Sequence, residues 1–145
     1  MKKLTALGIA VLLILATLTG CDGNEKIAWA KNLNISDIES IEAVRLPYLA
    51  SYENEQYKNY EKAEFVRIVE IINSAKGKLQ ESPEQLFGGG ICFYITLVDG
   101  TRHTFRNDGN EYLIIDGVSF KASYDWLSSW KNESLDSKVP DGFEY

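Results

Sequence analysis

A chain of 145 residues is long enough to bury one hydrophobic core and too short for two full domains. It carries 21 acidic and 15 basic residues, a formal charge of −6 at pH 7, and this acidity argues against binding nucleic acid or anionic lipid through a basic surface. Aromatic residues make up 12% of the sequence and charges of both signs are interspersed, so the composition is that of a globular protein and not of a disordered one.

The first 21 residues place a cationic start, an apolar run and a small residue in front of a cysteine. Lys2 and Lys3 precede an apolar run at 4–18, and Gly20 stands directly before Cys21. The run covers 15 residues, which is short for a membrane span of about 20, and the order of the parts is that of a secretory signal. An uncleaved anchor helix with an incidental cysteine is the alternative.

The end of this segment, Leu18-Thr19-Gly20-Cys21, resembles the lipobox of bacterial lipoproteins. The resemblance implies that the bond before Cys21 is cut and that Cys21 receives a diacylglycerol thioether. Two acyl chains would hold the domain stably at the extracytoplasmic face of the cell membrane. The use of Lys, Asn, Ile and Tyr is also similar to that of small uncharacterised lipoproteins of low-GC Gram-positive bacteria. Both likenesses concern location and not activity.

On this interpretation the chain has four segments. A signal peptide occupies 1–20, a lipid-anchored tether 21–36, a single domain 37–131 and a flexible C-terminal tail 132–145. Removing the signal takes away two lysines and no acid, which leaves 13 basic and 21 acidic residues and a formal charge of −8. Trp29 interrupts the polar tether, and we expect it to pack on its own domain in preference to a membrane or a partner.

A strand is expected within 38–46, where the alternation of apolar residues breaks at Ala43-Val44 and predicts a bulge or an edge strand. Pro47 ends it. The polar stretch that follows is rich in tyrosine, which gives recognition loops a large contact area at low entropy cost. We predict a partner-binding loop here, with local packing of the rings as the alternative. The candidate partner-binding residues are Tyr48, Tyr52, Tyr57, Tyr60 and, on a later strand, Tyr94.

The clearest helix is predicted over 62–76, where apolar residues recur at spacings of three and four. Its apolar stripe consists of Phe65, Ile68, Val69, Ile72 and Ala75. Gly77 is a natural residue for the left-handed position after a helix, so the helix is expected to end there. In a phosphate-binding loop, the glycines are followed by a lysine and a hydroxyl residue that open a helix. The glycine triplet at 88–90 is followed by a strand-like apolar run instead, which argues against such a loop.

Two hairpins and a short helix complete the expected elements. In the hairpin at 91–107, a three-residue loop ending in a left-handed Gly100 sets Phe93 opposite Phe105 and keeps the arginines off the apolar side. The other face, with Tyr94, Thr96 and Arg102, is expected to be solvated, and a small recognition surface is the alternative. The hairpin about Asp116-Gly117 admits a two- or a three-residue loop, and a helix is predicted over 124–131.

Few side chains offer catalytic or metal-binding chemistry. His103 is the single histidine, and no spacing in the sequence sets a nucleophile and an acid beside it. Cys92 has no disulfide partner once Cys21 is modified, and its place in an apolar strand predicts a buried, inert thiol. One histidine and one free cysteine are too few for a zinc site. We therefore predict no catalytic residue, no metal and no cofactor.

The order of strand, helix, meander and short helix predicts an α+β fold in two layers, in which an antiparallel sheet of four to five strands carries the main helix across one face. In outline this is similar to cystatin-like folds over 37–121. The Gln-x-Val-x-Gly loop motif of cystatins is absent, so the resemblance does not imply protease inhibition.

Two functions from different classes follow as hypotheses. The first is a membrane-anchored, non-catalytic module that binds a protein partner through the tyrosine-rich stretch or the open sheet face. The second is a small-ligand-binding protein or a hydrolase that uses His103 with nearby carboxylates. A cleft that joins His103 to an acid and a nucleophile would favour the second hypothesis.

Overall fold

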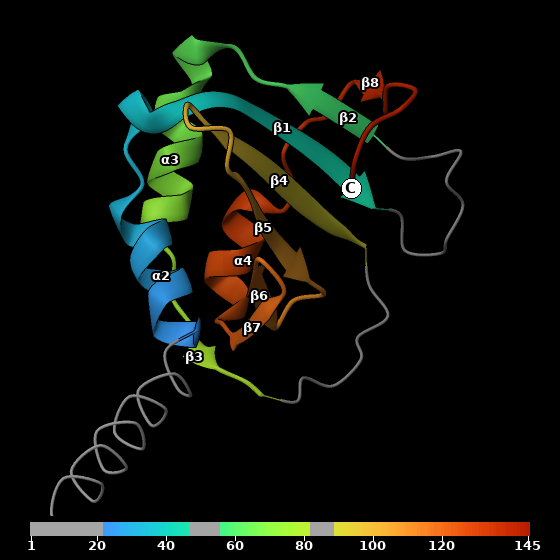
Figure 1. Ribbon diagram of the computed structural model, residues 1–145. Helices are drawn as coiled ribbons and strands as arrows, with labels where there is room; N and C mark the ends of the chain where they lie inside the picture. The colour runs from blue at the N-terminus through green and yellow to red at the C-terminus, as the bar shows by residue number, and fades with distance from the viewer. Residues whose placement is uncertain (1–21, 47–55, 82–88) are drawn as a thin grey trace, which may run out of the picture.

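The computed structural model of the chain describes residues 22–46, 56–81 and 89–145 (Figure 1). It is a mixed α and β structure, as the sequence predicts. Its helices are α2 (Asp22–Asn32), α3 (Phe65–Asn73) and α4 (Tyr124–Trp130), with 3-10 turns at Ile35–Asp37 and Lys62–Glu64. Its strands are β1 (Ile38–Leu46), β2 (Gln56–Asn59), β3 (Lys78–Leu79), β4 (Gly90–Leu97), β5 (Arg102–Asp108), β6 (Tyr112–Ile115), β7 (Val118–Lys121) and β8 (Ser137–Lys138). None of the helices in these ranges has both the length and the apolar character that crossing a membrane requires.

These strands form one antiparallel sheet in the order β3-β7-β6-β5-β4-β1-β2-β8. Strands β4 to β7 pair consecutively, and β1 lies between β4 and β2. The expected sheet of four to five strands is therefore part of a larger one. The additional strands are short, and β3 and β8 have two exposed residues each, so they carry no alternation from which a strand could be predicted.

The first hairpin has the predicted register. Phe93 lies opposite Phe105 and Ile95 opposite His103, and Gly100 adopts a left-handed φ of 85°. In the second hairpin, Ile115 lies opposite Val118, which selects the two-residue loop. Both loop residues, Asp116 and Gly117, have positive φ, the conformation of a type I′ turn that matches the twist of the flanking strands.

The irregular pattern of β1 has a different cause from the one expected. The register shift lies between Ile38 and Ser40 and not at Ala43-Val44, and β1 is an internal strand. Ala43 and Val44 are both fully buried because Ala43 packs in the main core and Val44 in a second cluster on the other face. Both faces of this strand are covered, so apolar residues stand at consecutive positions.

The main core lies between one face of the sheet and the three helices (Figure 1). The predicted stripe is buried there, from Phe65 in α3 to Ala75 beyond its end, as are Leu127 and Trp130 of α4. The strands contribute Ile41, Ile91, Phe93, Ile95, Phe105, Leu113, Ile115 and Phe120. Trp130 stands among Phe93, Phe105 and Trp126, with ring centroids 5.5 to 5.8 Å apart, so the aromatic rings join α4 to the sheet.

Much of the expected tether is a packed helix. In α2, Ala30 is fully buried, and Leu33 just after the helix is 6% exposed. Trp29 packs on its own domain, as predicted. The mean hydropathy of α2 is low because polar and charged residues occupy most of its positions, and only a few side chains reach the core. The packed structure consequently begins before residue 37.

Candidate functional site

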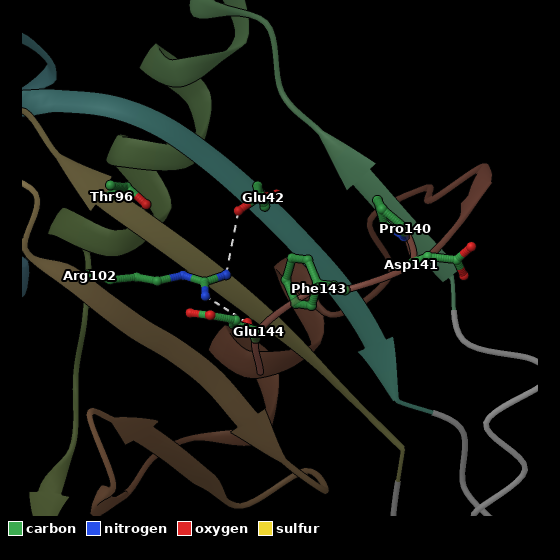
Figure 2. Close-up of a pocket in the computed structure, with 8 residues that line it drawn as sticks. Glu42, Thr96, Arg102, Pro140, Asp141, Phe143 and Glu144 are labelled. Atoms are coloured by element: carbon green, nitrogen blue, oxygen red, sulfur yellow. Dashed lines mark hydrogen bonds and ion pairs between the residues drawn. The ribbon is translucent and has the colours of Figure 1, made fainter.

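A pocket of about 370 Å³ opens on the sheet face opposite the helices (Figure 2). Its floor consists of Glu42 on β1, Thr96 on β4 and Arg102 on β5. These side chains share a face because Glu42 alternates with the buried Ile41 and Ala43, and Arg102 stands directly opposite Thr96 in the ladder. The wall is formed by the C-terminal residues Pro140, Asp141, Gly142, Phe143 and Glu144.

Arg102 forms hydrogen bonds and aromatic contacts at the centre of the pocket. Its Nη1 donates to the backbone oxygen of Glu144 at 2.6 Å, and its Nη2 lies 3.5 Å from Oε2 of Glu42. The guanidinium carbon is 4.5 Å from the ring centroid of Tyr94 and 5.1 Å from that of Phe143, so the cation lies against two aromatic rings. Its Nε is buried without a hydrogen-bond partner among the described residues. Arg102 thereby holds the C-terminal segment on the sheet.

Glu42 is fixed by a second hydrogen bond. The hydroxyl of Tyr57 donates to its Oε1 at 2.6 Å. Burial, followed by this hydrogen bond and the charge of Glu42, raises the pKa of Tyr57 above its usual value. The phenol therefore stays protonated, and both carboxylate oxygens of Glu42 are engaged at the floor of the pocket.

Three of the five candidate tyrosines are buried. Tyr57 is 9% exposed, Tyr60 4% and Tyr94 5%, whereas Tyr48 and Tyr52 lie outside the described residues. The hydroxyl of Tyr60 donates to Glu133 at 3.0 Å, in accord with the alternative of local packing. These three rings therefore offer little surface to a partner.

A second apolar cluster explains why this sheet face is not solvated as expected. It contains Val44, Tyr57, Cys92 and Tyr94, and Val139 and Phe143 of the C-terminal segment pack against it. The expected flexible tail thus covers the face with Val139 and Phe143, while Leu135 earlier in it is 4% exposed and packs in the main core. The missed signal is the presence of these three apolar residues in a segment that is otherwise mostly polar.

Cys92 is a buried thiol, as predicted. It is 3% exposed, and burial raises its pKa to about 11, so almost no thiolate exists at neutral pH. In the described part of the chain it forms no disulfide. Its reactivity therefore reports whether the C-terminal segment is in place.

Removal of the Phe143 ring is expected to expose this thiol. Phe143 makes edge contacts with Tyr57 and Tyr94 at 5.6 and 5.1 Å, and such pairs contribute roughly 0.5–1.5 kcal/mol each. In a Cys21→Ser background, where Cys92 is the single thiol, Phe143→Ala should raise the rate of modification by a thiol reagent about tenfold. Phe143→Leu is the matched control, and an unchanged rate in Phe143→Ala would mean that the segment does not protect Cys92.

The start of the C-terminal segment, just after α4, is held by Glu133. Its carboxylate forms an ion pair with Arg67 of α3 and accepts from Tyr60, and Arg45 of β1 donates to its backbone oxygen. Desolvation works to raise the pKa of Glu133, but the hydrogen bonds from Arg67 and Tyr60 outweigh it and the pKa lies below its usual value. These contacts fix the path of the chain from α4 toward the pocket.

His103 lies in a different cluster, on the helix side. Its Nδ1 is 2.8 Å from Oδ2 of Asp116, its ring stacks on Trp29 of α2 with centroids 4.1 Å apart, and Lys26 of α2 donates to the same carboxylate oxygen at 2.8 Å. The Thr104 N–H donates to Oδ1. The cluster joins α2 to the two hairpins.

The chemistry of this cluster is that of a structural contact. Desolvation works to raise the pKa of Asp116, but hydrogen bonds from Lys26, His103 and the Thr104 N–H outweigh it and leave the pKa lowered. Within the described ranges, no serine, threonine or cysteine side chain is hydrogen-bonded to His103, and no group of three or more metal-ligating side chains gathers. A histidine and an aspartate without a nucleophile complete only part of a catalytic triad.

Comparisons with protein-family models, with curated proteins and with solved structures found no match for this chain. Two features of the structure bear on function: a carboxylate-rich pocket that the C-terminal segment completes, and a His103–Asp116 contact that docks α2.

Proposed function

We propose that this chain is a lipoprotein held at the extracytoplasmic face of a bacterial cell membrane by a lipid on Cys21, and that its domain is a non-catalytic module that binds a protein partner. The anchor is supported by the order of the cationic start, the apolar run and Leu18-Thr19-Gly20-Cys21. The binding module is supported by the pocket around Arg102 and by the exposed carboxylates of Asp141 and Glu144 that line it.

The charge of the pocket indicates the class of partner that it would bind. Glu42, Asp141 and Glu144 line it together with one cation, Arg102. Arg102 is already engaged by Glu42 and by the Glu144 backbone, whereas Asp141 and Glu144 are exposed and form no ion pair among the described side chains. An excess of free carboxylates attracts a cation and repels an anion. The partner we propose therefore presents a lysine or arginine side chain to this pocket.

The His103 cluster favours the binding module over the alternative hydrolase. Trp29 stacks on one face of the imidazole, and Asp116 is shared between His103 and Lys26. A general base needs a free nitrogen within reach of a nucleophile, and the described residues place no such nucleophile in hydrogen-bond contact with the ring. The contacts of the His103 cluster attach α2 to the rest of the domain, and this attachment explains why the cluster is present.

Crosslinking from the pocket tests the partner proposal in the full chain. A photocrosslinking residue replaces the exposed Asp141, with a second one at Val66 on α3, which is 50% exposed, as the control. Membranes of the source cell should yield one dominant adduct from position 141 and not from position 66. Glu144→Lys should lower that adduct about tenfold, because it puts a like charge against the basic group of the partner.

Two results would count against the proposal. Equal capture from both positions would mean that the pocket does not select the partner. An adduct whose yield is unchanged by Glu144→Lys would mean that the charge of the pocket does not contribute to partner binding. The anchor is tested separately by mass spectrometry of the full chain from bacterial membranes. We expect a diacylglycerol mass on Cys21 and an unprocessed, unlipidated chain in Cys21→Ser.

A further inference from the structure

The first turn of α2 lies directly against the edge strand β3. A Cβ atom built on Gly23 would stand 2.6 Å from Cδ1 of Leu79, so the Leu79 side chain occupies the space beside the Gly23 backbone. Strand β3 is one edge of the sheet and β8 is the other. Figure 1 shows β3 and the start of α2 together at one end of the molecule, with β8 and the chain end toward the other.

Helix α2 is fixed to the domain by contacts along its length. Lys26 pairs with Asp116 at 2.8 Å, Trp29 stacks on His103, and Ala30 is fully buried. A helix held by side chains on two successive turns has one orientation relative to the sheet. The position of Gly23 beside β3 is therefore a fixed feature of the fold.

Covalent geometry then limits where a lipid on Cys21 can be. Two peptide units join Cys21 to Gly23, and each spans about 3.8 Å between Cα atoms. The Cα atom of Cys21 consequently lies within about 8 Å of that of Gly23. A glycerol thioether at this distance would bring the membrane headgroups to the level of β3.

The side chains at this edge suit a position beside membrane headgroups. Leu79 is 48% exposed, and Lys76 and Lys78 are exposed and have no ion pair among the described residues. Lys78 stands directly opposite Lys121 on β7, and Lys121 is paired with Glu111 at 3.4 Å. The ammonium groups of Lys76 and Lys78 are therefore the ones left for an anionic surface. Glu25 and Glu81 are exposed nearby in the sequence, so the attraction comes from the two lysines that precede Leu79 and not from the net charge of this end.

We infer that the edge formed by Lys76, Lys78 and Leu79 rests on an anionic lipid surface, with the Leu79 side chain among the headgroups and both ammonium groups against lipid phosphates. This inference rests on the proposed lipid at Cys21. Because β3 and β8 are opposite edges of the sheet, the same contact turns the β8 edge, beside which the C-terminal wall of the pocket lies, away from the bilayer. A partner could then reach the pocket from the cell exterior.

An environment-sensitive dye at position 79 tests this contact. The lipidated full chain with Leu79→Cys is labelled and reconstituted into vesicles of phosphatidylcholine, with or without phosphatidylglycerol. Cys92 does not compete for the dye because it is buried. The matched control is Val98→Cys, which is 66% exposed in the turn between β4 and β5. We expect a blue shift and quenching by a lipid-borne quencher at position 79, stronger with phosphatidylglycerol, and neither effect at position 98.

Replacement of the lysines tests the charge component. For each of Lys76→Gln and Lys78→Gln, the ratio of membrane-inserted to aqueous dye at position 79 in anionic vesicles should fall about fivefold. An aqueous signal at position 79 in a chain whose Cys21 carries lipid would overturn this inference and leave the proposed anchor intact. A chain without lipid on Cys21 would overturn both. Equal signals at positions 79 and 98 would also overturn it, because they show no preferred orientation.

Discussion

Replacing Trp130 with alanine is expected to lower the free energy of unfolding by about 3–5 kcal/mol, the usual cost of deleting a large buried aromatic side chain. Trp130 is 1% exposed and stands within 6 Å of the ring centroids of Phe93, Phe105 and Trp126. Urea unfolding of the full chain followed by circular dichroism measures the loss without relying on tryptophan fluorescence.

Trp130→Phe is the matched variant. The indole Nε1 of Trp130 is buried without a hydrogen-bond partner among the described residues, and an unpaired buried donor costs roughly 1–3 kcal/mol. Phenylalanine keeps most of the ring contacts and removes that donor, so its cost should be much smaller than that of alanine. If Trp130→Ala lowers the free energy of unfolding by less than about 1 kcal/mol, the packing of α4 does not contribute substantially to the stability of the core.

The parts of the fold that the sequence predicted well are those with long-range apolar periodicity. The stripe of α3 and the register of the first hairpin each depend on several apolar residues whose displacement would put them in water. For the second hairpin the sequence left two loops open, because Leu113, Ile114 and Ile115 are apolar at consecutive positions. All three are buried in the structure, so alternation could not choose the register.

The parts that the sequence did not predict are short or depend on distant partners. Helix α2 contains mostly polar residues, and it is held by the contacts of Lys26 and Trp29 with Asp116 and His103, which lie more than 70 residues away in the sequence. The same applies to the candidate site. The sequence predicts that Thr96 and Arg102 share one sheet face, but the wall that turns this face into a pocket comes from residues 140–144, a segment expected to be a flexible tail.

Asparagine at position 116 is expected to destabilise the domain by about 2 kcal/mol at neutral pH and to loosen α2 first. The amide can still accept from the Thr104 N–H and tolerates the positive φ of this turn position. It cannot form the ion pair with Lys26 or the charged hydrogen bond with His103. Hydrogen exchange of the full chain should therefore rise in residues 22–32 before it rises in β4 and β5.

The pH dependence of stability separates this electrostatic role from a simple packing defect. The folded-state pKa of Asp116 lies below its usual value, so its contribution to stability is fully present above the unfolded-state pKa near 4 and is lost as the pH falls through the folded-state value. Asp116→Asn should consequently lose less stability on acidification than the unmodified chain does. The exposed Asp136→Asn should leave the acid slope unchanged. If Asp116→Asn and the unmodified chain lose stability in parallel, the carboxylate does not hold α2 on the domain, and the fixed orientation inferred for the membrane-facing edge loses its main support.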